Sequence, residues 1–440
     1  GRGVKMNKFM DKFMKFFEEK ITPPLTKVSE VKHLRAIRDG IISTMPLILI
    51  GCMFLVIYNL PITAWKEWIT PRAGTFLIPF RITVSLMALY ASYGMGYALS
   101  KSYKLDGVTG GVLTMAAFIL MNVPKTVLDA ATGDELGWAL PMEYLGGSGM
   151  FVAIICMIIS IEILRFCKEK NLTIKMPEQV PPSVARSFEA LIPGAIIIVL
   201  VWIVRVVIGF DINELLMQLF APIINIAGSS LIGLLVPVVL MCLLWTTGIS
   251  GDSVIGSIVR PIWLVLMDQN MAAVAAGQAA ENIGVEGFLD LFLWIGGTGG
   301  TLALCILFLF SKSAYLKEVG KFSIIPGLFN ISEPIMYGAP VAVNPILAIP
   351  FVVGPIITTT VTYFAMSFNL VAKVSVMAPW TLPAPIKAFL GTNDWRAIVL
   401  VLINFAIYLI VYYPFFKAYE NKLISEETSK SEVQTNTVKA

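Results

Sequence analysis

One acidic residue stands inside a stretch that is otherwise apolar or rich in glycine and proline. Residues 329–345 read FNISEPIMYGAPVAVNP, and Glu333 is the only carboxylate among them. Burying a charge at membrane depth is costly unless partners compensate, so an ionisable group kept there is a functional hypothesis by default. The neighbours Asn330, Ser332 and Tyr337 are polar, and they could join Glu333 in binding a ligand.

Three further segments combine polar residues with glycine or proline in the second half of the chain. They are residues 245–256 (WTTGISGDSVIG), 294–301 (WIGGTGGT) and 378–386 (APWTLPAPI). Irregular backbone at membrane depth is tolerated only where it is buried in protein or lines a cavity. Interrupted apolar segments are therefore the best sequence indication of a transport site.

The composition requires a membrane around these segments. Of the 440 residues 57% are hydrophobic and 14% are charged, and the mean hydropathy is +0.78. The net charge of +4 comes from basic loops, which favours lipid headgroups over nucleic acid as the charged partner. Five scattered cysteines and the single histidine, His33, predict neither a metal site nor a disulfide framework.

The first half of the chain is typical of conventional membrane helices. We predict five spans, at about 37–59, 81–100, 108–124, 147–167 and 190–210. Residues 1–36 form an amphipathic cytoplasmic N-terminus, in which 6–20 place phenylalanines on one face of an interfacial helix. Cations gather in alternate loops, which predicts that both ends of the chain are cytoplasmic.

The second half is predicted to hold the ligand. Residues 212–228 are amphipathic and precede a span at about 229–247. Two re-entrant hairpins are expected, near 286–301 and 369–392. The remaining spans are predicted at about 301–311, 345–367 and 396–416.

The resulting fold class is an all-α polytopic membrane protein with about ten transmembrane helices, two re-entrant hairpins and an amphipathic interfacial helix. Residues 37–211 would form a scaffold and dimerisation half, and 212–416 a substrate-binding half. The polar residues 417–440 would be a cytoplasmic tail. Small residues at 107–117 (GVTGGVLTMAA) suit helix contacts, and we expect a homodimer through the scaffold half.

These motifs resemble the enzyme IIC (EIIC) membrane component of bacterial sugar phosphotransferase systems, in the lactose, cellobiose and N,N'-diacetylchitobiose branch. NISEPIMYGAPVAVNP is similar to that branch's glutamate motif. WTTGISGDSVIGSIVRPIW, LWIGGTGGTLAL and APWTLPAPIKAFLGT follow in the order the family would have. One departure is Ser250, where the resemblance leads us to expect a histidine.

The resemblance implies a permease in the bacterial cytoplasmic (inner) membrane that translocates a β-linked disaccharide such as diacetylchitobiose or cellobiose. A separate cytoplasmic EIIB protein, phosphorylated on cysteine by an upstream EIIA, would phosphorylate the sugar's 6-hydroxyl. The chain would be a transporter subunit whose phosphoryl donor lies on another chain, and its status as an enzyme is left open. The resemblance implies no cofactor, and Glu333 would hold the 6-hydroxyl and could accept its proton.

A sugar is uncharged and covered with hydroxyls, so its site needs aimed donors and acceptors and a flat apolar face. Glu333 can accept from two hydroxyls, Gly297 lets the backbone come close, and Trp380 offers a stacking face. Five residues could supply neutral hydrogen bonds: Thr247, Ser250, Thr298, Asn330 and Thr381.

Each assignment has a structural alternative. Glu333 could pair with Arg260 or Lys387, and Trp380 could belong to an interfacial aromatic belt. The glycines could serve only helix packing, and they lack the lysine of a phosphate-binding P-loop.

Two rival functions also remain. An ion-coupled secondary sugar transporter would use Glu333, Asp252 and Asp290 to bind a cation or proton. A membrane enzyme acting on lipid-linked substrates would need acids or histidines clustered at a membrane face, whereas the single histidine, His33, is far in the sequence from Glu333, Asp252 and Asp290.

Overall fold

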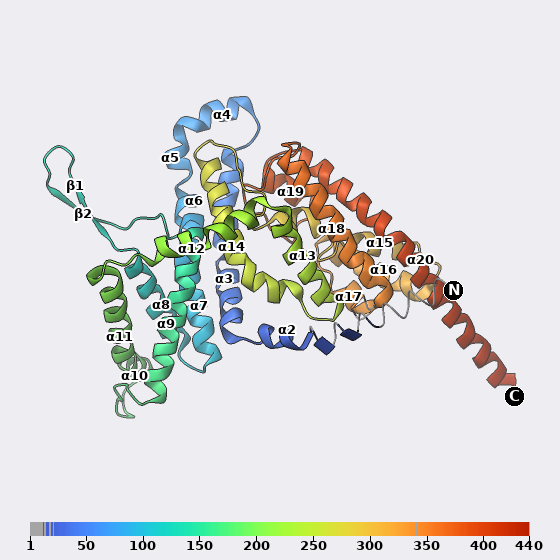
Figure 1. Ribbon diagram of the computed structural model, residues 1–440, viewed down its shortest axis with the longest axis horizontal. Coiled ribbons are helices and arrows are strands. Elements are labelled where there is room, and N and C mark those ends of the chain that lie inside the picture. The colour runs from blue at the N-terminus through green and yellow to red at the C-terminus, as the bar shows by residue number, and fades with distance from the viewer. Residues whose placement is uncertain are drawn as a thin grey trace. The chain divides into compact units, whose positions relative to one another are not determined.

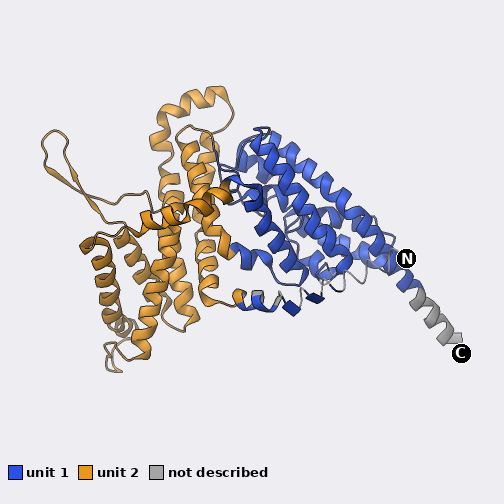
Figure 2. Cartoon of the chain, in the orientation of Figure 1, with its two compact units in different colours: residues 1–27, 229–256, 280–440 blue, residues 28–228, 257–279 orange. Residues whose placement is uncertain are grey.

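The computed structural model describes residues 22–339, 341–342 and 344–439, together with 12, 15, 16, 19 and 20 (Figure 1). The interfacial helix predicted over 6–20 therefore lies mostly outside the described residues. The chain divides into two compact units, which Figure 2 shows in different colours. Unit 2 comprises residues 28–228 and 257–279, and unit 1 comprises residues 1–27, 229–256 and 280–440.

Unit 2 is a bundle in which α7 packs on α3, α8 and α9. Five of its helices, α3, α7, α8, α9 and α11, overlap the five predicted spans, because apolar runs of this length carry their own helical signal. The helices are α3 (Lys32–Tyr58), α4 (Thr63–Ile69), α5 (Ala73–Phe76), α6 (Ile78–Thr83), α7 (Met87–Ser102), α8 (Gly107–Met121), α9 (Met150–Glu169), α10 (Pro182–Glu189), α11 (Leu191–Trp202) and α12 (Ile212–Ser229). A short helix, α2 (Thr22–Ser29), precedes them.

The small residues of α8 are used for packing within the chain. A side chain at Gly110 would collide with Ser100 of α7, and one at Gly111 would collide with Tyr93. Close helix approach through small residues is how membrane helices associate. Part of the stretch that suggested a dimer therefore forms the α7–α8 contact instead.

The loop at 125–146 contains a β-hairpin that the sequence analysis did not predict. β1 (Lys125–Leu128) pairs antiparallel with β2 (Glu135–Ala139). Its residues are mostly exposed, so the pairing rests on backbone hydrogen bonds more than on a buried face.

Unit 1 holds the interrupted segments among long helices. α18 packs on α13 and α20, and α15 packs on α16 and α20. The helices are α13 (Leu231–Thr246), α15 (Leu302–Leu309), α16 (Ala314–Leu328), α17 (Glu333–Gly338), α18 (Pro345–Ser367), α19 (Ala384–Thr392) and α20 (Arg396–Lys439). α14 (Gly251–Ala275) begins in unit 1 and continues in unit 2.

The fold class is confirmed as an all-α multi-pass membrane protein, with the hairpin β1–β2 as a local addition. Within the described residues six helices are long and apolar enough to cross a membrane, or seven if α12 and α13 are counted together. The count of ten stays a prediction. The assignment of dimerisation to 37–211 and of sugar binding to 212–416 also stays a prediction.

Candidate functional site

The glycine-rich segment after residue 288 leaves helical geometry inside unit 1. A π-helical turn at Leu289–Leu293 ends at Trp294, and the chain then turns back until Leu302 donates to the carbonyl of Ile295 at 3.1 Å. Gly297 has φ of +108°, which side-chain-bearing residues rarely adopt, and a Cβ there would lie 2.6 Å from Cβ of Ser332. The glycine thus brings this loop against the residue that precedes Glu333.

Side chains of α20 satisfy the carbonyls that the irregular backbone exposes. Asn404 donates to the carbonyl of Phe292 at 3.0 Å, Tyr408 to Leu293 at 2.9 Å and Tyr412 to Gly299 at 2.7 Å. The three donors recur every four residues, so they lie on one face of the helix. Non-helical backbone can persist at membrane depth because such partners replace water.

Lys387 of α19 supports the same segment from another side. Its ammonium contacts the carbonyl of Trp294 at 3.3 Å and that of Trp380 at 3.5 Å, and the residue is 1% exposed. Asp290 is the acidic group near enough to act electrostatically on it. The long side chain therefore joins the two irregular segments, while the charge has an opposite charge nearby.

Asn330 connects three parts of the site through one amide. Its Oδ1 accepts from the backbone N–H of Gly296 at 3.0 Å, and its Nδ2 donates to the carbonyls of Trp380 and Leu382, both at 2.7 Å. The residue is buried and has φ of +64°, a left-handed conformation that asparagine tolerates better than most residues. Asn330 thus fixes the glycine loop and the turn before α19 next to the glutamate motif.

Asp252 connects the start of α14 to the same loop. Its Oδ2 accepts from Nε1 of Trp245 at 3.0 Å and from the hydroxyl of Thr298 at 2.6 Å. Asp252 thus supports the irregular backbone by hydrogen bonding, as a structural residue would, and is not left open for a cation.

The glycine loop at 296–300, Asn330 and the turn around Trp380 form a hydrogen-bonded platform, and Glu333 lies at its edge. It is the first residue of α17, is exposed, and follows Ser332, which is buried against Gly297. Among the described residues its carboxylate makes no hydrogen bond and no ion pair. Glu333 does not form the ion pair with Lys387 that was the structural alternative, because the Lys387 ammonium contacts backbone carbonyls instead.

The remaining predicted residues lie in turns around the platform. Ser250 precedes α14, and its hydroxyl accepts from the backbone N–H of Ser253 at 3.4 Å, as an N-cap does. Thr247 donates to the carbonyl of Leu244 at 2.7 Å. The side chains of Trp380, which is 48% exposed, and Thr381 are both accessible in the turn before α19.

The structure therefore joins some of the predicted residues and leaves others apart. Hydrogen bonds and packing connect Gly297, Thr298, Asn330 and the backbone of Trp380, and Glu333 follows directly. The side-chain hydrogen bonds of Thr247 and Ser250 stay within their own turns, and the side chain of Thr381 makes no hydrogen bond to the described residues.

Comparison with known proteins gives this arrangement a family. Residues 38–355 match the family model described as "Phosphotransferase system, EIIC". The chain belongs to this family. The resemblance inferred from the glutamate motif and the glycine segments is therefore confirmed.

Several EIIC relatives match along nearly the whole chain. The cellobiose-specific EIIC component of Geobacillus stearothermophilus is 39% identical, covering 95% of this chain and 96% of its own. The lichenan permease IIC component of Bacillus subtilis (strain 168) is 38% identical, covering 97% and 98%. The crystal structure of ChbC, the IIC component of the N,N'-diacetylchitobiose-specific phosphotransferase system, matches with a TM-score of 0.87 and 40% identity, covering 94% and 99%.

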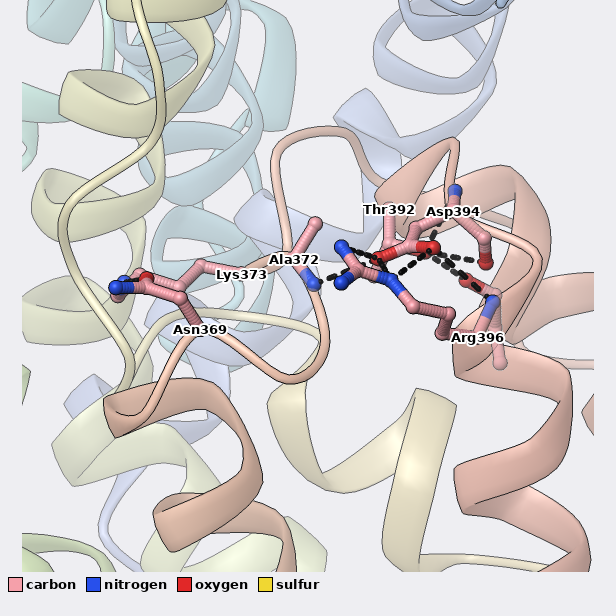
Figure 3. A network of polar contacts seen from close by, with 7 residues as sticks. Asn369, Ala372, Lys373, Thr392, Asp394 and Arg396 are labelled. Atoms are coloured by element: carbon pink, nitrogen blue, oxygen red, sulfur yellow. Dashed lines mark hydrogen bonds and ion pairs between the residues drawn. The ribbon is translucent and has the colours of Figure 1, made fainter.

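A second network, which the sequence did not predict, links the segment after α18 to the segment after α19 in this EIIC protein (Figure 3). Asp394 accepts from the backbone N–H of Ala372 at 2.9 Å and pairs with the guanidinium of Arg396 at 2.9 Å. Burial raises the pKa of Asp394, but hydrogen bonds from Arg396 and from Ala372 outweigh it and lower that pKa. The ionised carboxylate therefore holds the end of α19 to the start of the irregular segment after α18.

Proposed function

We propose that this EIIC protein carries a β-linked disaccharide across the bacterial cytoplasmic membrane and presents the sugar's 6-hydroxyl to phosphorylated EIIB. The observation that carries the proposal is the exposed carboxylate of Glu333 beside the platform built by Asn330 and the glycine loop. The names of the relatives support the substrate class, because cellobiose, lichenan and N,N'-diacetylchitobiose are all β-linked sugars.

In this proposal an unpaired carboxylate is what a neutral hydroxylated ligand needs. Glu333 would accept hydrogen bonds from two sugar hydroxyls, and Trp380 would stack on the apolar face of a ring. Asn330 and Thr298 of the platform already make hydrogen bonds to the backbone and to Asp252. Their main role would therefore be to position Glu333 and Trp380, and less to bind the sugar themselves. Thr247, Ser250, Thr298 and Thr381 would add neutral hydrogen bonds around the ring.

The proposed chemistry transfers a phosphoryl group from one chain to the sugar. The S–P bond of the EIIB phosphocysteine breaks, an O–P bond forms at the 6-hydroxyl, and the thiolate leaves with the electron pair. Glu333 accepts the proton of the hydroxyl as the O–P bond forms. The phosphoryl donor thus belongs to EIIB, and an upstream EIIA would recharge it.

The relatives support a partner of this kind. The lactose-specific EIICB component of Staphylococcus aureus (strain N315) is 30% identical, and this chain spans 73% of its length. Its name joins the C and B components in one chain, and we propose that an EIIB component works with this EIIC chain as well. We also propose cytoplasmic termini and a homodimer through residues 37–211, where α8 leaves Val108 and Val112 exposed.

Sugar binding tests the proposal directly. Glu333→Gln keeps shape and one acceptor but loses the charge, so cellobiose or diacetylchitobiose affinity should fall by about 1.5–3 kcal/mol, the range for hydrogen bonds to charged groups. Glu318→Gln is a matched control, since Glu318 is an exposed acid on α16 paired with Lys321. Equal affinities of the two variants, measured calorimetrically in detergent, would remove Glu333 from the site.

A further inference from the structure

A cavity of about 250 Å³ lies within unit 2, at the end where four helices meet. α7 and α9 end there, α8 begins there, and the last turn of α10 leads into α11 there. Its lining includes four basic and two acidic side chains, a net charge of +2: Lys101, Lys104, Lys168, Arg186, Asp106 and Glu189. A concave surface with this excess of cations attracts an anion.

Two of the six charges are already partly engaged with each other. Asp106 caps α8 by accepting from the backbone N–H of Thr109 at 2.9 Å, and Arg186 lies 3.7 Å from its carboxylate. Lys104 and Lys168 are exposed at the cavity. Lys104 has φ of +60°, so an unusual backbone conformation is kept where this ammonium meets the cavity.

The helix that carries Arg186 has a second, apolar face. Arg186, Glu189 and Ala190 line the cavity. Val184, Phe188 and Leu191 recur at helical spacing on the opposite face and are 41%, 41% and 57% exposed. α10 is continuous with α11, and residues Pro182–Val207 form a candidate membrane span. The cavity therefore lies at the level where a bilayer's headgroups meet its hydrocarbon.

We propose that this cavity binds the headgroup of an anionic phospholipid, with the lipid's acyl chains lying along the exposed apolar surface of α10 and α11. The phosphate would be held by Lys104, Lys168 and the face of Arg186 turned from Asp106. A soluble phosphate ion carries the same kind of charge, but it would make no contact with the apolar residues Val184, Phe188 and Leu191. Basic pockets at the ends of membrane helices bind anionic headgroups by this combination of contacts.

The test is a lipid titration of the whole protein in detergent, with bound lipid counted by native mass spectrometry. Phosphatidylglycerol should bind more tightly than phosphatidylcholine. The variant K104Q/K168Q should weaken phosphatidylglycerol binding about thirtyfold, which corresponds to about 1 kcal/mol per charge. K66Q/K125Q is the matched control, because Lys66 and Lys125 are exposed lysines away from the cavity, and it should bind as wild type does.

Each other outcome overturns the proposal. Equal loss in the two double variants means that bulk charge and not the cavity binds lipid. Equal affinity for the two lipids means that the headgroup charge is not recognised. Displacement of phosphatidylglycerol by millimolar inorganic phosphate identifies a soluble anion site. If the double variant K104Q/K168Q does not fold, Lys168→Gln alone takes its place in the titration, with an expected fall in phosphatidylglycerol affinity of about fivefold.

Discussion

Asn330 should hold the glycine loop in place, and replacing it by glycine isolates that role. The amide makes three hydrogen bonds, to Gly296, Trp380 and Leu382. A net contribution of about 1 kcal/mol each gives about 3 kcal/mol for Asn330→Gly. Asn330→Ala should cost about 1 kcal/mol more, because φ of +64° strains a residue with a Cβ.

The matched control is Asn369, which shares the residue type and the left-handed backbone. Its φ is +56° and it is exposed, and its side chain accepts one hydrogen bond, from Lys373 at 3.2 Å. Asn369→Ala should lower stability by only about 1 kcal/mol, through backbone strain at positive φ. Asn369→Gly should leave stability almost unchanged.

Hydrogen exchange of the peptide covering residues 289–302 measures the effect where it acts. If Asn330→Gly lowers the free energy of local opening by about 3 kcal/mol, the amides of this peptide should exchange roughly a hundredfold faster. Sugar affinity should fall in the same variant, because Gly297 would no longer be fixed against Ser332. If these amides stay as protected in Asn330→Gly as in Asn369→Gly, Asn330 does not organise the loop.

Three further predictions concern single contacts. Ser250→Ala should lower stability by about 1 kcal/mol through loss of the cap, and Ser250→His should accumulate more sugar phosphate than Ser250→Ala in uptake with phosphorylated EIIB if the position faces the reacting hydroxyl. Tyr408→Phe should cost about 1–3 kcal/mol in thermal stability, since it leaves the buried carbonyl of Leu293 without this donor, whereas exposed Tyr413→Phe should cost almost nothing. Because the pKa of Asp394 is lowered in the folded chain, its stabilisation should be present at neutral pH and be lost as pH falls below about 4; Asp394→Asn should remove that part of the pH dependence of unfolding.

The sequence predicted the fold best where one local signal was enough. Apolar runs with clear ends placed α18 at Pro345–Ser367 as expected, and α9 within two residues of its predicted end. α14 was missed because GISGDSVIG appears broken by glycine and aspartate, yet Ser250 caps a continuous helix of 25 residues there. The hairpin β1–β2 is mostly exposed, so its sequence lacks the alternation of apolar and polar residues by which a strand is recognised.

The arrangement of the candidate site could be predicted from the sequence only in part, for the same reason. Asn330, Gly297 and Thr298 were recognisable as polar or backbone-exposing residues near Glu333. The partners from α20 were not, because which carbonyl a distant tyrosine meets is decided by tertiary packing. A signal was present in the repeat of Asn404, Tyr408 and Tyr412 every four residues along an apolar helix.

We propose that the sugar is phosphorylated as it crosses the membrane, with Glu333 at its 6-hydroxyl. Uptake into proteoliposomes that enclose phosphorylated EIIB, followed by mass analysis of the internal sugar, tests it most directly. We predict that wild type and Glu318→Gln deliver the disaccharide as its 6-phosphate without an ion gradient, and that Glu333→Gln does not. Unmodified sugar inside the vesicles, with uptake driven by a proton or sodium gradient and unaffected by EIIB, would rule out transport coupled to phosphorylation.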